Sequence, residues 1–225
     1  MSTSARKLFT QFFIYCILVV MPISSKKSLN NLSGEVKTCK KCLDLVKTRK
    51  QPIPGSGAAK AKLIIAGYYP TPEGSEIAGI PFSGDEDGNI IRKAIEVSGL
   101  SAENDVFLTY MVKCTPRKVS KLINVMKPLD HHINNCFNYF TEEISIITPH
   151  LIISLGISTT KVILDKFFSI DKKVDNMALL HMRLFENPSF KLVPFFSPKA
   201  VFAGNISEEK YLEDFKKLSK LFTIV

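Results

Sequence analysis

The sequence predicts an α/β domain, a three-layer α/β/α sandwich around a four-stranded parallel sheet. Short apolar runs bounded by turn signals alternate with amphipathic helical patterns along the chain. Strands that alternate with helices form parallel sheets covered on both faces. The length of 225 residues fits one medium-sized domain with a proper hydrophobic core.

The first half of the chain contributes two strands and two helical regions. Residues 29–49 follow a helical pattern that breaks near two cysteines, and the turn-rich segment QPIPGSGAAK follows it. Residues 62–67 form a short apolar run typical of a strand buried in a parallel sheet. Residues 88–99 predict a helix that ends at a glycine C-cap. Residues 105–112 alternate in the manner of a second strand.

The second half repeats this alternation after a basic loop at 115–128. The expected elements are a helix at 129–147, a strand at 150–156, a helix at 158–168, a strand at 191–196 and a helix at 207–222. In an open parallel sheet, ligands bind at the carboxyl ends of the strands. Tyr68, Tyr110 and Ser197 all fall at such ends, so we expect them to face one crevice.

Lysine and arginine outnumber the acidic residues by 30 to 21, which gives a net charge of +9. Most of the excess lies in residues 26–62, which hold ten basic residues and two acidic ones. A basic face is the electrostatic footprint of a protein that binds a phosphate backbone. An ordinary lysine-rich surface is the alternative.

Four cysteines have the layout of a metal-binding set. Cys39 and Cys42 form a C-x2-C pair, and Cys114 and Cys136 follow. Thiolates are soft ligands that select zinc or an iron–sulfur cluster. The wide gap between the second and third cysteines argues against a compact zinc ribbon. Separate buried cysteines, packed as small hydrophobes, are the alternative.

The N-terminal residues 1–27 form an apolar appendage to a domain that spans 28–225. Arg6 and Lys7 precede an apolar stretch that ends near Ile23, as in a signal peptide. The stretch is short for a membrane-spanning helix. Secretion conflicts with thiolate ligands, because an oxidising compartment favours disulfides. We therefore expect a cytoplasmic protein, with a membrane anchor, organelle targeting or a misassigned start left open for this segment.

Seven segments occur in a characteristic order: CKKC, LIIAGYYPTPEG, GIPFSGDEDGNII, VFLTYMVKC followed by Pro116, the helix with Cys136, LIISLGIS and FFSPKAV. In order and spacing they resemble the uracil-DNA glycosylase superfamily, most closely its iron–sulfur family 4, over roughly residues 29–222. The resemblance implies the uracil-DNA glycosylase fold and a 4Fe–4S cluster on the four cysteines, with zinc as the alternative. It also implies DNA as the partner of a monomer that needs no other cofactor.

Three catalytic positions of the family carry different residues here. Tyr68 replaces the glutamate of GEAPG, Tyr110 replaces the asparagine that reads uracil, and Ser197 replaces the histidine that stabilises the departing base. A tyrosine with a pKa near ~10 is a poor base at neutral pH, and the paired donor and acceptor of the amide are lost. The resemblance makes Tyr68 and Ser197 catalytic positions and Tyr110 a base-binding one.

The resemblance gives roles to further residues. Phe82 in GIPFSG is the platform on which a flipped base stacks, unless it is a core phenylalanine. Glu73 is the carboxylate nearest the vacated glutamate position and our first candidate to activate water. Asp85, Glu86 and Asp87 are further candidates, against the alternative of an acidic surface loop.

The segment after Ser197 corresponds to the loop with which the family probes the duplex. Lys199 is expected to meet a phosphate, and Val201 or Phe202 to enter the base stack. A turn that packs its apolar residues inward is the alternative. The histidines match no family position and are expected to be structural or surface residues.

The sequence thus favours a divergent glycosylase that removes uracil or another damaged base in base-excision repair. The alternative is a catalytically inactive iron–sulfur module that binds DNA. A zinc-stabilised domain without a nucleic-acid role is a third possibility. The retained Phe82 supports the first, and the residues at 68, 110 and 197 support the second.

Overall fold

The computed structural model describes residues 27–117, 127–170 and 175–222. Within them, one sheet has the strand order β1-β3-β2-β4-β6-β5. Its four central strands are parallel: β3 (Val106–Tyr110), β2 (Leu63–Gly67), β4 (Leu151–Leu155) and β6 (Lys191–Phe195). The expected α/β class and its four-stranded parallel sheet are confirmed.

Two short antiparallel strands extend the sheet beyond the expected four. The strand β1 (Ser56–Gly57) pairs with β3 at one edge, and β5 (Phe185–Glu186) pairs with β6 at the other. Each has two residues, too few for an apolar alternation to be read from the sequence. The sequence analysis therefore missed both, and placed β1 in a turn-rich segment.

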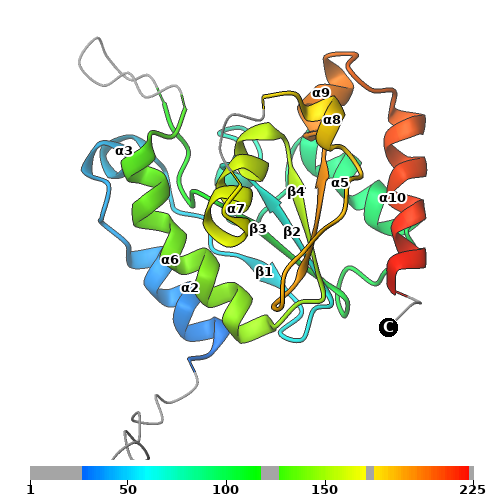
Figure 1. Cartoon of the computed structure of the whole chain (residues 1–225). Helices are drawn as coiled ribbons and strands as arrows, with labels where there is room; N and C mark the ends of the chain where they lie inside the picture. Colours follow the sequence, from blue (N-terminus) through cyan, green and yellow to red (C-terminus); the bar gives the residue numbers. More distant parts are fainter. Residues whose placement is uncertain (1–26, 118–126, 171–174, 223–225) are drawn as a thin grey trace, which may run out of the picture.

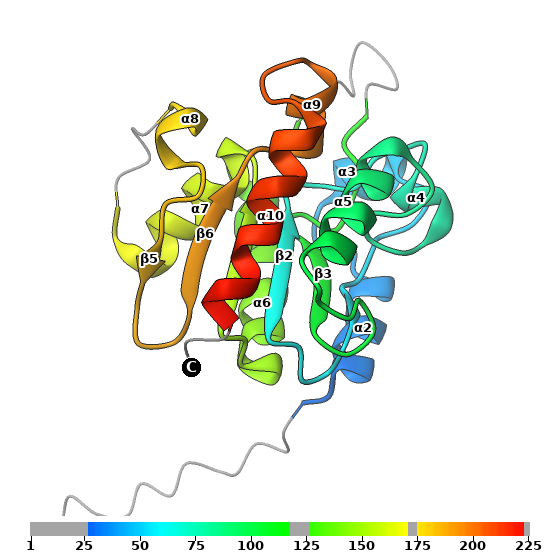
Figure 2. The same ribbon diagram turned by 90° about the vertical axis from the view of Figure 1, so that its right-hand side faces the viewer.

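Helices cover both faces of the sheet (Figure 1). The helices α5 (Glu86–Val97) and α10 (Glu208–Phe222) lie on one face, toward the viewer in Figure 2. The other face carries α2 (Leu29–Thr38), α6 (Asp130–Ile147) and α7 (Ile157–Phe168). Along β2, Leu63 and Ile65 pack in the first core, while Ile64 and Ala66 pack in the second. This alternation of side chains creates the three layers.

Helix α5 begins at Glu86, two residues before the expected start. The side chain of Asp85 accepts a hydrogen bond from the Gly88 N–H at 2.8 Å, which makes Asp85 the N-cap. Gly99 follows the helix at a φ of 74°, which a glycine adopts at little cost.

The short helices lie at the carboxyl end of the parallel strands. They are α3 (Leu43–Thr48), α4 (Ser75–Ala78), α8 (Met177–Leu180) and α9 (Pro198–Phe202). None of the helices in the described ranges is both long and apolar enough to cross a membrane. The expected appendage, apart from Lys27, and most of the basic loop at 115–128 lie outside the described residues.

A buried ion pair links Lys113, in the segment after β3, to Glu143 on α6. The Lys113 ammonium lies 2.7 Å from a Glu143 carboxylate oxygen, and both side chains are almost fully buried. The Thr109 hydroxyl also donates to Glu143, at 2.8 Å. Thr109 precedes Tyr110 and Lys113 follows it by three residues. The network therefore holds the carboxyl end of β3 in place, and the cavity described below begins there.

Candidate functional site

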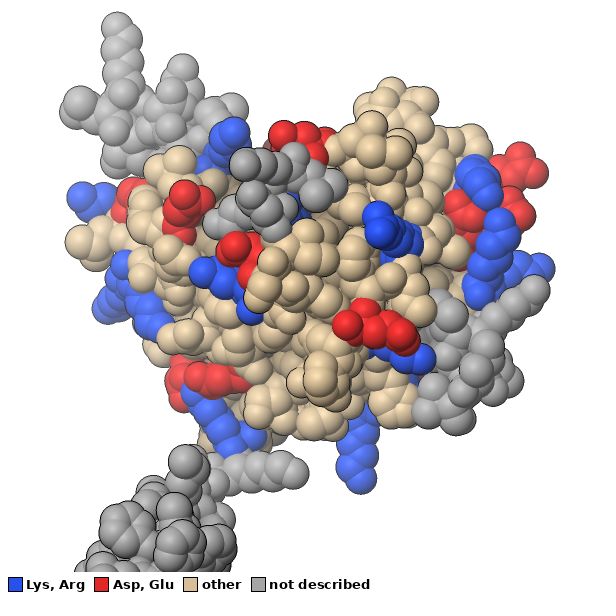
Figure 3. Space-filling view, in the orientation of Figure 1, with Lys and Arg blue, Asp and Glu red and all other residues tan. Residues whose placement is uncertain are grey.

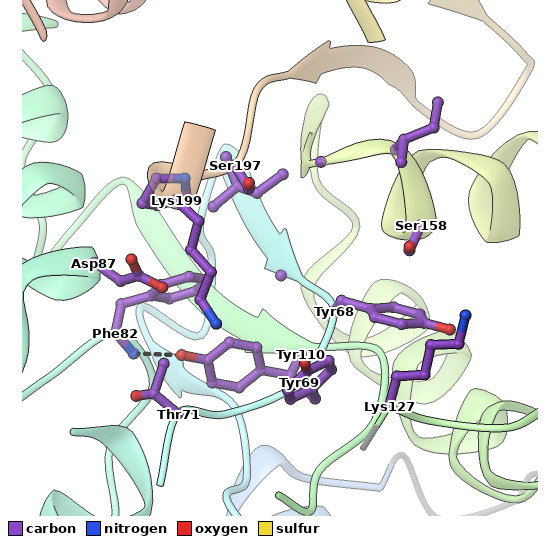
Figure 4. A pocket seen from close by; sticks show the side chains of 15 residues that line it. Tyr68, Tyr69, Thr71, Phe82, Asp87, Tyr110, Lys127, Ser158, Ser197 and Lys199 are labelled. Atoms are coloured by element: carbon purple, nitrogen blue, oxygen red, sulfur yellow. Dashed lines mark hydrogen bonds between the residues drawn. The ribbon is translucent and has the colours of Figure 1, made fainter. Parts of the chain in front are cut away.

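A cavity of about 330 Å³ lies where β2, β3, β4 and β6 end. Its walls come from several loops (Figure 4) and comprise Gly67, Tyr68, Tyr69, Thr71, Phe82, Asp87, Tyr110, Lys127, Leu155, Gly156, Ile157, Ser158, Ser197, Pro198 and Lys199. The expected convergence of Tyr68, Tyr110 and Ser197 on one crevice agrees with this placement. Thr71, Lys127 and Ser158 had no signal in the sequence that marked them as cavity residues.

Tyr110 covers the face of Phe82. The centroids of the two rings are 4.7 Å apart, with a tilt of 34°. The Tyr110 hydroxyl accepts a hydrogen bond from the Phe82 N–H at 3.0 Å and shares another with the Ser75 hydroxyl at 2.8 Å. Only 3% of Tyr110 and 4% of Phe82 are exposed, so Phe82 offers little free surface to a base. Burial raises the pKa of the Tyr110 phenol, which stays neutral.

Gly67 allows these two rings to pack at the end of β2. A Cβ at this position would lie 2.7 Å from the Phe82 ring and 2.8 Å from the Tyr110 ring. Phe82 itself has a φ of 51°, a conformation that is rare for a bulky residue and needs support from its surroundings. Its N–H donates to the Tyr110 hydroxyl and its carbonyl oxygen accepts from Arg92, both at 3.0 Å, and these hydrogen bonds supply that support.

The carboxylate in the cavity wall is Asp87, whereas Glu73 is exposed and outside the wall. Asp85 is occupied as the α5 cap and accepts a hydrogen bond from the Thr71 hydroxyl. Burial raises the pKa of Asp87 to about 6, although the nearby Lys199 lowers it. Asp87 is mostly ionised at neutral pH and close to the range that suits a general base.

Lys199 reaches across the cavity from α9 (Figure 4). Its Nζ lies 5.9 Å from the centre of the Tyr69 ring. Ser197 caps the start of α9 without a side-chain hydrogen bond to that helix. Val201, for which a DNA contact is expected, is partly buried and packs against the first core. The neighbouring Phe202 is 50% exposed, so it is the apolar side chain of this loop that faces solvent.

The four cysteines converge beside the cavity, and none forms a disulfide. Cys42, Cys114 and Cys136 are buried with Leu45 and Val112, and Cys39 is partly buried next to them. Donors surround the sulfur atoms: Arg49 lies 2.8 Å from the Cys114 Sγ, and the Asn135 amide lies 3.4 Å from the Cys42 Sγ. Such hydrogen bonds orient and tune thiolate ligands.

Burial also sets the protonation state of the sulfur atoms. Burial raises the pKa of the Cys114 thiol to about 12 and that of Cys136 to about 11. A bound cation is therefore needed to hold these sulfurs as thiolates.

Tyr69 connects the cysteines to the cavity. Its ring packs against the cluster of Cys42, Cys114 and Cys136 and also lines the cavity. The backbone follows the same route, because the Val112 N–H donates to the Tyr68 carbonyl oxygen at 2.9 Å. The cysteine cluster and the cavity wall are therefore in direct contact through Tyr69.

A second group of possible metal ligands, Asp44, His131 and His132, has a structural role. The His132 Nδ1 accepts a hydrogen bond from the Leu129 N–H at 3.0 Å, and its Nε2 lies 2.8 Å from Asp44. Because Nδ1 is an acceptor, Nε2 carries the proton and donates it to Asp44. The pair joins α6 to α3, in line with the expectation for the histidines.

Charged side chains of both signs are interspersed on the face shown in Figure 3. Lys37, Lys40, Lys41, Lys47, Lys50, Lys60 and Lys62 are exposed. Lys27 and Lys62 have acidic partners: Lys27 lies 2.5 Å from Glu35 and Glu142, and Lys62 lies 3.5 Å from Asp105. The basic side chains on this face do not form one continuous patch.

Comparison with known proteins identifies the family. Residues 54–219 match the uracil DNA glycosylase superfamily. The chain is 32% identical to a type-4 uracil-DNA glycosylase of Saccharolobus solfataricus over 86% of each chain. It is 28% identical to one of Archaeoglobus fulgidus, over 87% of this chain and 94% of that one. A type-5 uracil-DNA glycosylase of Pyrobaculum aerophilum is 27% identical over 47% of this chain and 49% of its own. The chain therefore belongs to the uracil-DNA glycosylase superfamily.

Proposed function

We propose that this protein is a DNA glycosylase that hydrolyses the bond between deoxyribose and a damaged base. The observation that carries this proposal is the cavity, where Asp87 and Lys199 stand on walls that also hold the aromatic rings of Tyr68 and Tyr69. A base in a duplex is reached only after its nucleotide is flipped out of the stack. The relatives named above are uracil-DNA glycosylases, so uracil is the first substrate to test, with other damaged bases next.

The chemistry assigns different tasks to the two charged residues. The Asp87 carboxylate activates water or stabilises the positive sugar that forms as the bond breaks. The Lys199 ammonium stabilises negative charge on the departing base, the task that Ser197 performs less well because a hydroxyl carries no charge. Electrostatic groups of this kind contribute roughly a hundredfold to a thousandfold in rate.

In this cavity the edge of the base is recognised by groups other than the side-chain amide of an asparagine. The Tyr110 hydroxyl is bonded to Phe82 and Ser75, so position 110 presents a ring and no free donor or acceptor. Recognition of the base edge then falls to Asp87 and Lys199, and stacking to Tyr68 or Tyr69. This arrangement supports a substrate range other than uracil alone.

The four cysteines are proposed to hold a 4Fe–4S cluster, with zinc as the alternative. Four thiols from three chain segments, three of them buried, offer the soft donor set that such a cluster takes. The cluster, when bound, supplies a covalent tie among three chain segments. Arg49, which donates to both Cys114 and the Cys39 carbonyl oxygen, positions the cysteine loop for it.

The partner is proposed to be DNA, bound by a monomer. The exposed lysines of residues 37–62 would meet phosphates, and the exposed Phe202 would enter the stack. A specific observation also favours the second candidate, an inactive DNA-binding module: Tyr110 occupies the face of Phe82 on which a base would stack.

Base release decides between these two functions. The assay treats a uracil-containing duplex with the full-length protein and then detects abasic sites by alkali cleavage. We expect release by the wild type, a loss of about a hundredfold or more in Asp87→Asn, and little change in Glu73→Gln. A large loss of base release in Glu73→Gln, with little loss in Asp87→Asn, would make Glu73 the active carboxylate. DNA binding without release of uracil or hypoxanthine would favour the inactive module.

A further inference from the structure

The guanidinium of Arg49 contacts two of the three chain segments that carry the cysteines. Its Nη1 lies 2.8 Å from the Cys114 Sγ, and its Nη2 donates to the Cys39 carbonyl oxygen. Only 4% of Cys114 is exposed, and Arg49 is itself partly buried. Solvent and salt screen a partly buried cation much less than one on the surface. The positive charge therefore acts strongly on this sulfur.

The backbone around Arg49 holds the side chain in this position. The Arg49 N–H donates to the Leu45 carbonyl oxygen at 2.8 Å, where α3 ends. The next N–H, that of Lys50, donates to the buried Glu76 carboxylate at 2.8 Å. The Gln51 side chain donates to the Glu76 carbonyl oxygen, also at 2.8 Å. A donor fixed in this way stabilises negative charge without having to reorient when that charge develops.

Two other charged side chains act on the cysteines. Lys113 acts on Cys136, but its ammonium lies 2.7 Å from the Glu143 carboxylate, which offsets its charge. Asp44 acts on Cys42 and is negative, so it disfavours further negative charge on the sulfurs. Neither side chain therefore supplies uncompensated positive charge to a sulfur, whereas the guanidinium beside Cys114 does.

We infer that Arg49 raises the reduction potential of the iron–sulfur cluster proposed above, because it stabilises the more negative of two oxidation states. The inference rests on that proposed cluster. Reduction by a one-electron donor, the electrode in the test below, adds one negative charge to the iron and its sulfur ligands, and no bond forms or breaks. Net charge and hydrogen bonds to the sulfurs are among the features that set such potentials. The guanidinium provides both at Cys114.

The test measures the midpoint potential of anaerobically purified full-length protein by voltammetry. Arg49→Gln removes the charge and keeps an amide donor. At a fixed applied potential this variant should show an about tenfold lower ratio of reduced to oxidised cluster, which corresponds to about 59 mV for one electron. Arg49→Lys keeps the charge and should change the ratio less.

Lys41→Gln is the matched control. Lys41 is an exposed cation of the segment that carries Cys39 and Cys42, and its Nζ lies over the Tyr139 ring, 4.8 Å from the centroid. The substitution removes the same charge at the surface of the same segment. It should leave the ratio of reduced to oxidised cluster nearly unchanged, because solvent screens an exposed charge.

A measurement on the wild type decides the inference even if Arg49→Gln fails to assemble a cluster. Wild-type protein grown with ¹⁵N-labelled arginine is brought to the paramagnetic state of the cluster and studied by pulsed electron paramagnetic resonance. We expect a ¹⁵N coupling from the guanidinium beside the Cys114 sulfur. Arg49→Lys protein with the same label should lack this coupling.

Three results would overturn the inference with the cluster present: equal potentials in the wild type and Arg49→Gln, an equal decrease in Lys41→Gln, or the absence of a ¹⁵N coupling. A wild-type cluster without a measurable couple would also overturn it. Wild-type protein that contains zinc and no iron would reject the inference together with the proposed cluster. Base release is assayed separately, so failure of the proposed glycosylase activity leaves the result on Arg49 intact.

Discussion

The ring of Tyr110 lies over the ring of Phe82, with 4.7 Å between their centroids, and its hydroxyl accepts a hydrogen bond from the Phe82 N–H. A ring stacked on Phe82 with an oxygen at this N–H makes the contacts that a pyrimidine with a carbonyl group would make. Tyr110 therefore occupies the face and the N–H of Phe82, the residue on which the family resemblance would stack a base. Two predictions follow from the relationship between these residues.

Replacing Tyr110 by phenylalanine should destabilise the protein by about 1–3 kcal/mol, because the buried Phe82 N–H loses its acceptor. The ring and its packing remain in this variant. Urea unfolding monitored by circular dichroism measures the change. An unchanged free energy of unfolding would mean that another acceptor, such as water, replaces the phenol.

Replacing Tyr110 by asparagine should increase the rate of uracil release. The substitution exposes the Phe82 face and restores an amide with a paired donor and acceptor. It should also lower the free energy of unfolding by about 3 kcal/mol, because it removes a buried aromatic ring. Single-turnover kinetics at a temperature where the variant stays folded separates the two effects. A lower rate than that of the wild type would contradict the role of Tyr110 as a filler of the base site.

Base release should rise with pH through about 6, the pKa to which burial raises Asp87, because the ionised carboxylate is the active form. The effect on stability has the opposite sign. The unfolded carboxyl group, with a pKa near ~3.9, loses its proton first, so the native state binds more protons between about pH 4 and 6. Ionisation of Asp87 therefore lowers stability as pH rises through that window.

The Asp87→Asn substitution tests both effects. It should abolish the rise in activity near pH 6. It should also stabilise the protein at neutral pH by on the order of 1 kcal/mol, because solvent screening of this partly exposed group reduces the full effect of the pKa shift. Thermal unfolding at pH 4 and pH 7 measures the difference. Equal effects at both pH values would contradict the assignment of the pKa.

Removal of a cysteine ligand should remove iron. Anaerobically purified Cys114→Ser protein is expected to lose visible absorption and bound iron, and to melt at a lower temperature than the wild type. Elemental analysis and absorption spectra measure these changes. Bound zinc in colourless wild-type protein would instead support the zinc alternative.

Breaking the buried ion pair should cost about 3–5 kcal/mol in Glu143→Gln, because the substitution leaves the Lys113 ammonium without a counter-charge. The matched control is Glu208→Gln, which breaks the exposed pair with Lys93 at 2.8 Å and should cost at most about 1 kcal/mol. Denaturant unfolding compares the two variants. Similar costs would mean that the buried pair contributes little beyond its hydrogen bonds.

The regular elements with clear periodicity were predictable, and the shortest ones were not. Residues 29–49 showed the break that separates α2 from α3, and strands were expected at 62–67, 105–112, 150–156 and 191–196, close to where the parallel strands lie. The two-residue edge strands β1 and β5 and the single-turn helices are too short to have a period. Their positions depend on tertiary contacts, such as the pairing of Ser56 with Leu108.

The sequence by itself determined the fold class and the set of four cysteines, because periodicity and residue type are local properties. Only the tertiary structure decided that Asp87, and not Glu73, lines the cavity, since Asp85 is used to cap α5 and the helix then sets the direction of Asp87. It also placed Tyr110 over Phe82. The side chains of a cavity come from loops that are far apart in the sequence and close in space. Local sequence patterns do not predict those contacts.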